Sequence, residues 1–374
     1  MKKFLILVVL HFLRLAAKIQ LLKNKPLVIG VTGSAGKSST VAAIETALKQ
    51  KYQVKSTGTT NSESGIPLSI LGLKMTDYSP FDWLRVILLI PVQLLFYRPS
   101  YTIFVAEMGI DSLKPPKNMG YLLSIIKPQI GVFLNVLPVH TEQMRNVDAI
   151  AVEKGKLIAS LPTNGFAIVN KNDPRTQIKT AAKTVLFDGT ALGAANTIGK
   201  ILGVPPIKSF TPPPGRGQVF AGINNSKLID SSYNASGIPM LLALAHLAKR
   251  RAIRRIAVLG DMRELGDLAA SEHKIVAKEA YRLADKIITV GPLTEIYFPK
   301  DPKLVAQFAN SWQAGKFLQT YIKSGDVVLF KGSQNTIFLE TAVEMCLKNR
   351  ADATKLCRRG KFWDKQREKY AKEN

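Results

Sequence analysis

The apolar positions of this 374-residue chain alternate between short continuous runs and segments of helical spacing. Residues 39–51 have helical spacing, with Val41, Ile44 and Leu48 on one face. Short apolar runs that are typical of buried strands occur at residues 26–31, 102–106, 130–134, 166–170 and 184–187. Strands that alternate with helices form parallel sheets covered on both faces, so we expect a mostly parallel α/β domain over residues 27–208.

A proline-rich break at residues 204–215, VPPIKSFTPPPG, separates this pattern from a second one. Beyond the break, strands are expected at residues 228–230, 255–259, 286–290 and 327–330, and helices at 237–250, 271–283 and from about 336. This alternation predicts a smaller, Rossmann-like α/β domain over residues 209–349. The charged tail, residues 350–374, is expected to be helical or frayed.

Residues 32–40, TGSAGKSST, form a glycine-bearing turn between the first expected strand and the helix after it. The phosphate-loop pattern G-x-x-x-x-G-K-[ST] fails by one position, because no glycine stands five residues before Gly36. The segment can still bind phosphate despite this difference in spacing, because Gly33 and Gly36 leave backbone N–H groups free to face phosphate oxygens at a helix N-terminus. Lys37 can neutralise phosphate charge, and the Ser38 hydroxyl can ligate magnesium. We therefore expect a P-loop-type ATPase domain with ATP and Mg2+, rather than a glycine turn with a chance lysine.

Two further side chains follow expected strands of this domain. Glu107 comes directly after an apolar run, at the carboxyl edge of the sheet, where such sheets bind ligands. His140 follows the next strand by a short loop, and a lone histidine of this kind is more often structural. Together, Glu107 and His140 are typical of a metal-binding pair on neighbouring strand ends.

Two apolar segments raise the question of a membrane. Residues 1–26 contain an apolar run too short to span a bilayer, after which His11, Arg14 and Lys18 follow at helical spacing. For this segment we favour a basic amphipathic helix on the inner membrane face, over packing on the protein's own core or a secretory signal. Residues 81–97, FDWLRVILLIPVQLLFY, are nearly all apolar, and we favour a buried helix kinked by its proline over a second membrane-surface element.

The formal net charge of +25 attracts polyanions: nucleotides, an anionic membrane surface or nucleic acid. Charge alone does not choose among them, and a basic surface that only aids solubility is the plain alternative. No recognition-helix or aromatic-basic motif supports a specific nucleic acid as partner. The two cysteines, Cys346 and Cys357, lack CxxC spacing, so we expect neither a disulfide framework nor a zinc site, and a cytoplasmic location fits.

Taken in order, the motifs of the chain resemble the Mur ligase family. The motifs TGSAGKSST, NSESGIPLSILGL, VAEMG, NVLPVH and EKGKLIASLP look like its central domain, and GRG, IDSSYNAS, VLGDMRELG and KGS look like its C-terminal domain. DSSYNAS and LGDMRELG resemble the branch that adds D-alanyl-D-alanine to UDP-N-acetylmuramoyl-tripeptide more than folylpolyglutamate synthase or the other Mur ligases. The resemblance implies an ATP-dependent amide ligase of peptidoglycan precursor synthesis that works through an acyl phosphate.

The resemblance also implies a role for each matching residue. The residues that would hold ATP are Thr32, Gly33, Ser34, Ala35, Gly36, Lys37, Ser38 and Ser39, with Arg216, Asp230, Tyr233 and Asn234 from the C-terminal domain. Those that would hold magnesium are Ser38, Glu107, His140 and Lys154. Lys154 matches a lysine that the family carbamylates, with Lys156 as the alternative. The catalytic residues would be Lys37, Lys154, His140 and Arg216.

The muramoyl-peptide and D-alanyl-D-alanine substrates would meet Asn61, Ser62, Asp261, Glu264 and Lys331. For Asp261 and Glu264 the alternative is a loop held by helix capping.

One departure from the family concerns the substrate. Only about 26 residues precede the first strand, so we do not expect the N-terminal domain that binds the UDP end in this family. With the charge of +25, this leads to the hypothesis that the enzyme works at an anionic membrane and recognises its acceptor differently. We expect a monomer. The alternatives are a Mur-like ligase with another acceptor, such as a different muramoyl peptide or a lipid-linked precursor, a non-catalytic nucleotide-binding scaffold, and a nucleic-acid-dependent NTPase. The presence of Lys37, Glu107, His140 and Lys154 disfavours the scaffold.

Overall fold

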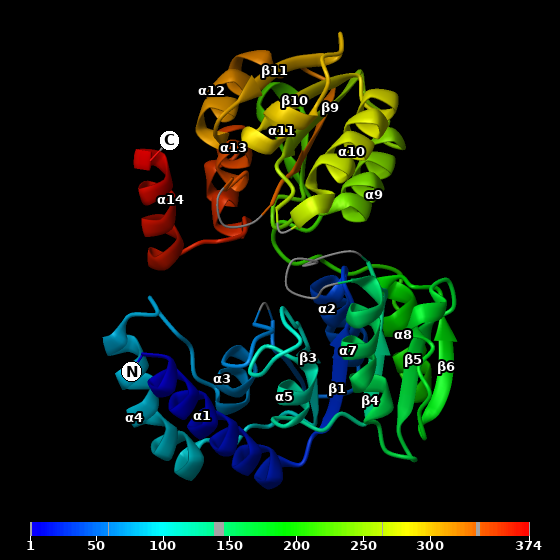
Figure 1. Ribbon diagram of the computed structural model, residues 1–374, viewed down its shortest axis with the longest axis vertical. Coiled ribbons are helices and arrows are strands. Elements are labelled where there is room, and N and C mark those ends of the chain that lie inside the picture. The colour runs from blue at the N-terminus through cyan, green and yellow to red at the C-terminus, as the bar shows by residue number, and fades with distance from the viewer. Residues whose placement is uncertain (1, 59, 138–145, 264, 334–336, 374) are drawn as a thin grey trace. The chain divides into compact units, whose positions relative to one another are not determined.

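The computed structural model describes residues 2–58, 60–137, 146–263, 265–333 and 337–373. The chain divides into two compact units, residues 1–211 and 212–374 (Figure 1). The division falls inside the proline-rich break that the sequence indicates as a boundary.

The first unit contains a six-stranded parallel sheet in the order β2-β3-β1-β4-β5-β6. Its strands are β1 (Leu27–Thr32), β2 (Val54–Ser56), β3 (Ile103–Glu107), β4 (Ile130–Phe133), β5 (Phe166–Asn170) and β6 (Lys183–Phe187). On the central strand, Val31 pairs with Glu107 of β3 on one side and Val132 of β4 on the other. The register therefore places Glu107 beside the end of the strand that leads into residues 32–40.

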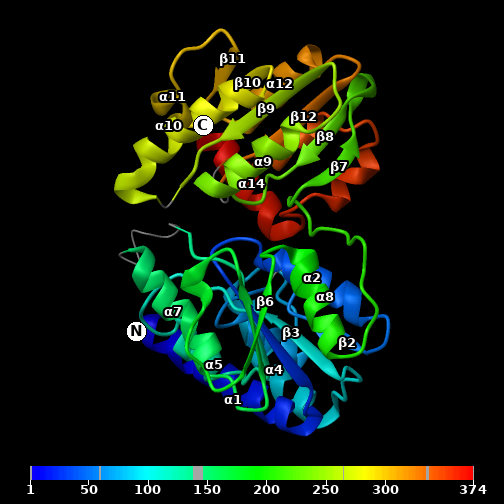
Figure 2. The same ribbon diagram turned by 90° about the vertical axis from the view of Figure 1, so that its right-hand side faces the viewer.

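Helices cover both faces of this sheet (Figure 2). They are α1 (Lys2–Asn24), α2 (Lys37–Leu48), α3 (Gly65–Leu71), α4 (Pro80–Phe96), α5 (Met119–Leu123), α7 (Val147–Ala159) and α8 (Ala191–Ile201), with a 3-10 turn at Pro174–Thr176. On one face, Ile29 and Val31 pack with α2 and α8. On the other face, Val28 packs with α3, α5 and α7. This alternation along β1 gives the first unit two apolar layers.

The two apolar segments suspected of membrane contact, α1 and α4, share a separate small core in the first unit. Leu10 and Leu13 of α1 pack there with Val86 and Ile90 of α4. The alternative for residues 1–26, packing on the protein's own core, is thus realised on one face of α1. The expectation that residues 81–97 form a buried helix is wrong for half of α4, whose Leu88 is 66% exposed. Neighbouring elements cover only one side of a helix that is apolar nearly all round. In the ranges described, no helix is long and apolar enough to cross a membrane.

The second unit is also α/β, with a sheet in the order β11-β10-β9-β12-β8-β7. Its strands are β7 (Gln218–Ala221), β8 (Lys227–Asp230), β9 (Arg254–Gly260), β10 (Lys286–Val290), β11 (Leu304–Phe308) and β12 (Asp326–Lys331). All neighbours are parallel except the edge strand β7, which is antiparallel to β8.

Helices cover both faces of the second sheet as well. The helices of this unit are α9 (Gly237–Ala248), α10 (Ala269–Leu283), α11 (Pro292–Tyr297), α12 (Ser311–Tyr321), α13 (Glu340–Met345) and α14 (Lys361–Glu373), with 3-10 turns at Ile223–Asn225, Gly266–Leu268 and Arg350–Lys355. Helices α9 and α10 pack on one face, and α12 and α13 on the other. The predicted fold class, a P-loop-type parallel domain followed by a smaller Rossmann-like α/β domain, is confirmed.

Candidate active site

The phosphate-binding loop joins the end of β1 at Thr32 to the start of α2 at Lys37. Gly33 and Gly36 have φ angles of +151° and +84°, a backbone region that side chains disfavour. A Cβ atom on Gly33 would also lie 2.8 Å from the Cβ of Leu134. Glycine is therefore required where the loop turns back over the end of β4, and the loop leads directly into the N-terminus of α2, a position that favours phosphate.

The loop is held by Asn135, which follows β4. The Asn135 side chain accepts a hydrogen bond from the Ala35 N–H (2.9 Å) and donates one to the Ala35 carbonyl (3.2 Å). The Asn135 carbonyl accepts the Ser34 N–H (3.0 Å), and the Ser34 hydroxyl donates to the Leu137 carbonyl (3.2 Å). Sequence reasoning missed Asn135, although its position directly after a central strand within the NVLPVH motif is a usable signal.

Two of the predicted magnesium ligands, Ser38 and Glu107, are in direct contact. The Ser38 hydroxyl donates to Glu107 Oε2, and Asn61 Nδ2 donates to Glu107 Oε1 (3.0 Å). Glu107 is buried at 1% exposure, and its N–H donates to Thr57 Oγ1 (2.9 Å). A carboxylate and a hydroxyl at a loop whose Lys37 and helix N-terminus suit phosphate are the hard oxygen donors that Mg2+ prefers. The residues therefore fit a magnesium–nucleotide site.

Lys154 of α7 is buried beside this site, at 3% exposure. Burial lowers the pKa of its ammonium well below the usual value. The positive charge of Lys37 lowers it further, while the carboxylates of Asp111, Glu107 and Glu153 act to raise it. By contrast, the side chain of Lys156 is about half exposed and pairs with Glu153 at 2.5 Å. The surroundings of Lys154 favour it over Lys156, and they add Asp111, which sequence reasoning missed, to the residues near the site.

Ser62 was expected to meet the substrate and His140 to hold magnesium, and a contact between Ser62 and substrate stays a prediction. The hydroxyl of Ser62 accepts the Gly65 N–H (3.1 Å) at the start of α3. His140 lies outside the described residues. Among the residues that are described, no group of three or more His, Cys, Asp and Glu side chains could hold a metal ion. Of the residues expected to hold magnesium, the structure therefore shows Ser38 and Glu107 in direct contact.

In the second unit, the residues expected to meet ATP gather at the end of β8. The guanidinium of Arg216 lies over the ring of Tyr233, 4.2 Å from its centroid, and Arg216 Nε has no hydrogen-bond partner among the described residues. Asp230 is fully buried, and its Oδ1 accepts the Ser232 N–H (3.0 Å) and hydroxyl (2.6 Å). Burial raises the pKa of the Asp230 carboxyl.

Lys331, at the end of β12, belongs to the same group. Its Nζ donates to the Asn234 carbonyl at 2.8 Å. Burial lowers the pKa of Lys331 to about 8, and the nearby charge of Arg216 acts in the same direction. Arg216, Tyr233, Asn234 and Lys331 thus form one cluster at neighbouring strand ends. The motifs had placed Lys331 near the dipeptide substrate and not with the residues expected to meet ATP, and its contact with substrate stays a prediction.

Asp261 takes the role that was left as its alternative, helix capping. Its Oδ1 accepts the Thr294 N–H (2.8 Å) at the start of α11, and the residue is 3% exposed. Burial raises the pKa of this carboxyl despite the capping bonds. A contact between Asp261 and substrate stays a prediction, and Glu264 lies outside the described residues.

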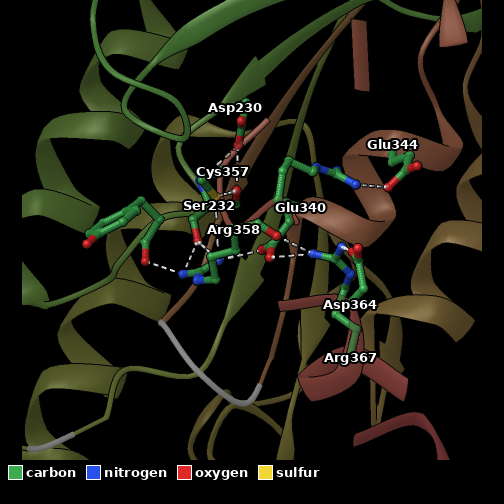
Figure 3. Close-up of polar contacts among 10 residues, drawn as sticks. Asp230, Ser232, Glu340, Glu344, Cys357, Arg358, Asp364 and Arg367 are labelled. Atoms are coloured by element: carbon green, nitrogen blue, oxygen red, sulfur yellow. Dashed lines mark hydrogen bonds and ion pairs between the residues drawn. The ribbon is translucent and has the colours of Figure 1, made fainter. Parts of the chain in front are cut away.

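The loop that carries Tyr233 is held by the C-terminal tail (Figure 3). Arg358 forms a buried ion pair with Glu340 of α13 at 2.5 Å, and its guanidinium also donates to the Ser232 (3.3 Å) and Tyr233 carbonyls. Arg367 of α14 lies 3.8 Å from the other oxygen of Glu340. The tail was predicted to be helical or frayed, and helical is correct for α14. Its part around Arg358, however, is buried structure of the second unit.

A phosphate-binding loop and an acidic residue at the edge of a parallel sheet, followed by a Rossmann-like unit, define a nucleotide-dependent α/β enzyme. Residues 31–198 match the Mur ligase middle domain, and residues 215–334 match the family described as Mur ligase, glutamate ligase domain. The chain belongs to the Mur ligase family, whose members are ATP-dependent ligases that use Mg2+.

Individual proteins of similar sequence are ligases of the same kind by name. The UDP-N-acetylmuramoyl-tripeptide--D-alanyl-D-alanine ligase of Synechocystis sp. is 27% identical in an alignment 373 positions long. The alignment covers 86% of this chain and 74% of that protein. The ligase of the same name from Mycobacterium tuberculosis is 27% identical over 351 residues, 76% of this chain and 62% of that protein.

Solved structures support the fold. The MurF ligase of Thermotoga maritima, in complex with ADP, superposes with a TM-score of 0.75 at 23% identity, over 96% of this chain and 84% of that chain. A bifunctional folylpolyglutamate synthase/dihydrofolate synthase superposes with a TM-score of 0.62 at 14% identity, over 90% of this chain and 94% of that chain.

Proposed function

We propose that this chain joins D-alanyl-D-alanine to a UDP-N-acetylmuramoyl-tripeptide, or a related muramoyl peptide, with conversion of ATP to ADP and phosphate. The relatives at 24–27% identity that carry this name support the choice of substrates. The observation that supports this activity is the hydrogen bond from Ser38 to Glu107 next to the glycine loop, with Lys37 and the buried Lys154 beside them.

The proposed reaction has two steps. A carboxylate oxygen of the peptide attacks the γ-phosphorus of ATP, the bond to ADP breaks, and an acyl phosphate forms. The amine of the dipeptide then attacks the acyl carbon, loses a proton, and expels phosphate as the amide forms. Lys37 and the N–H groups of its loop stabilise the charge that builds on the phosphoryl oxygens. Magnesium, when bound, would supply Lewis-acid stabilisation of the phosphates, held by Ser38 and Glu107.

In the second unit, Arg216 and Tyr233 are proposed to contact the nucleotide, and Asp230, Asn234 and Lys331 to keep their loop in place. The unpartnered Nε of Arg216 supports this role, because a buried guanidinium donor is costly unless a partner meets it.

The test measures ADP release in the presence of UDP-N-acetylmuramoyl-tripeptide, with and without D-alanyl-D-alanine, and the mass of the product. We expect ADP release that depends on both substrates, and a pentapeptide product. ADP release without a pentapeptide would mean that the acceptor is another molecule, whereas no ADP release with any peptide would remove the ligase assignment.

Lys154 provides a separate prediction. Burial lowers the pKa of the Lys154 ammonium and so favours the neutral amine, and a neutral amine reacts with CO2 to give a carbamate and a proton. With 13C-labelled bicarbonate we expect a carbamate carbon signal in the NMR spectrum, and we expect it to fade as the pH falls and the amine takes up a proton. Lys154→Met should abolish the signal, while Lys156→Met should keep it. A signal that follows Lys156 instead would contradict the assignment.

A further inference from the structure

Helix α1 carries an apolar stripe on the side that faces away from the protein core. Its exposed members recur every three or four residues, with exposures of 40 to 70%: Val8, Phe12, Leu15, Ile19 and Leu22. The opposite side of the same helix, with Leu13 and Ala17, is fully buried. An α1 that served only to cover the core would carry polar side chains on its outer side.

Helix α4 repeats this arrangement. Its exposed stripe, with exposures of 46 to 83%, consists of Phe81, Leu84, Leu88, Val92 and Leu95. Its inner side, with Val86 and Ile90, is buried in the core that it shares with α1. The two stripes together are called the α1/α4 apolar face below.

The two helices lie side by side in both views (Figures 1 and 2). Their contact is made by the buried side chains of the shared core and by Lys23 Nζ, which donates to the Leu94 carbonyl. More than half of the large exposed apolar side chains in the described part of the chain lie on α1 and α4. Single exposed apolar residues are ordinary, but a concentration of this kind marks a docking surface.

The charge around this face identifies what docks there. Helix α1 contains no Asp or Glu. The one acidic residue of α4, Asp82, is buried and held by Arg85 and by backbone N–H groups, so its charge is compensated. Lys18 and Lys23 are exposed beside the α1 stripe. A second copy of the chain would bring its own net charge of +25 to the same face, whereas an anionic lipid surface complements it.

We propose that the α1/α4 apolar face lies on an anionic lipid bilayer. Each helix has its other side fixed in the core of the first unit, so both lie along the membrane surface with their outer side chains among the lipid headgroups and upper acyl chains. The proposal rests on α1 and α4 alone and does not depend on which substrate the enzyme ligates. Its consequence is that the ligase would act at the surface of the membrane.

The test is co-sedimentation of the full chain with vesicles of phosphatidylglycerol and phosphatidylcholine, and with vesicles of phosphatidylcholine alone. We expect binding to the anionic vesicles that weakens with salt, and at least tenfold weaker binding by the Leu15→Gln/Leu88→Gln variant. Lys18→Glu should weaken binding at low salt only. The matched control is Leu242→Gln/Ile253→Gln, which changes two exposed apolar residues of the second unit and should bind as the wild type does.

Melting curves separate docking from folding, because the substituted side chains are exposed and the variants should melt like the wild type. Wild-type protein that stays in the supernatant with anionic vesicles at low salt overturns the proposal. Equal binding by Leu15→Gln/Leu88→Gln and by the control also overturns it. A dimer that Leu15→Gln/Leu88→Gln dissociates, without vesicle binding by the wild type, would assign the face to a second copy. ADP release measured in solution tests the ligase activity independently.

Discussion

Replacing Lys37 with alanine is expected to lower the turnover number for acceptor-dependent ADP release by about 10²–10³-fold, the typical effect of removing one preorganised donor from a developing charge. Lys37 is the positively charged side chain of the loop itself, and its Nζ lies 2.9 Å from the carbonyl oxygen of Gly33, the first of the two loop glycines. The affinity for D-alanyl-D-alanine should change little, because Lys37 is proposed to act on the phosphates and not on the dipeptide.

The control for this variant is Lys49→Ala, at the other end of the same helix. Lys49 is exposed and pairs with Glu45 across one turn, an interaction worth little to stability. We expect Lys49→Ala to keep full activity. If both variants lose activity alike, general charge around α2 and not the loop controls the rate. If neither loses activity, the phosphate loop is not the ATP site.

The strands that sequence reasoning placed well are those that form continuous apolar runs, including the edge strand β6 at residues 184–187. The predicted runs at residues 166–170 and 286–290 coincide with β5 and β10, because buried parallel strands are continuous apolar runs. The strands it missed are β2, β7 and β11, which lie at or next to sheet edges and carry mixed polar and apolar residues. A short edge strand forms because it pairs with one neighbouring strand. The few residues of the edge strand itself do not reveal that neighbour.

The part of the candidate site that could be predicted is the part formed by neighbouring strand ends. Strand register alone puts Glu107 beside the loop, so its contact with Ser38 could be anticipated. Asn135 and Arg358 were missed because each acts on backbone about 100 or more residues away in the sequence. The pattern of α4 likewise could not say which of its apolar sides the rest of the protein would cover.

Replacing Arg358 with alanine is expected to lower the free energy of unfolding of the second unit by about 3–5 kcal/mol, because the variant leaves the buried Glu340 carboxylate with only the more distant Arg367, at 3.8 Å. Both side chains of this pair are nearly inaccessible, at 3% and 0% exposure. Urea denaturation followed by tryptophan fluorescence measures the change. The matched control is Arg359→Ala, whose pair with Glu344 is 2.7 Å long but partly exposed, and which should cost at most about 1 kcal/mol.

The pH dependence identifies the cause of this loss. Burial raises the pKa of Glu340, and the charge of Arg358 opposes that rise. Without Arg358 the pKa rises further, so Glu340 can take up a proton and bury as a neutral acid. The destabilisation of Arg358→Ala relative to wild type should therefore shrink as the pH falls, while that of Arg359→Ala should not. Arg358→Met/Glu340→Leu should recover most of the stability at neutral pH, since it removes both charges. If Arg358→Ala and Arg359→Ala lower the free energy of unfolding equally at every pH, the Arg358–Glu340 ion pair is not what holds the tail against the Tyr233 loop.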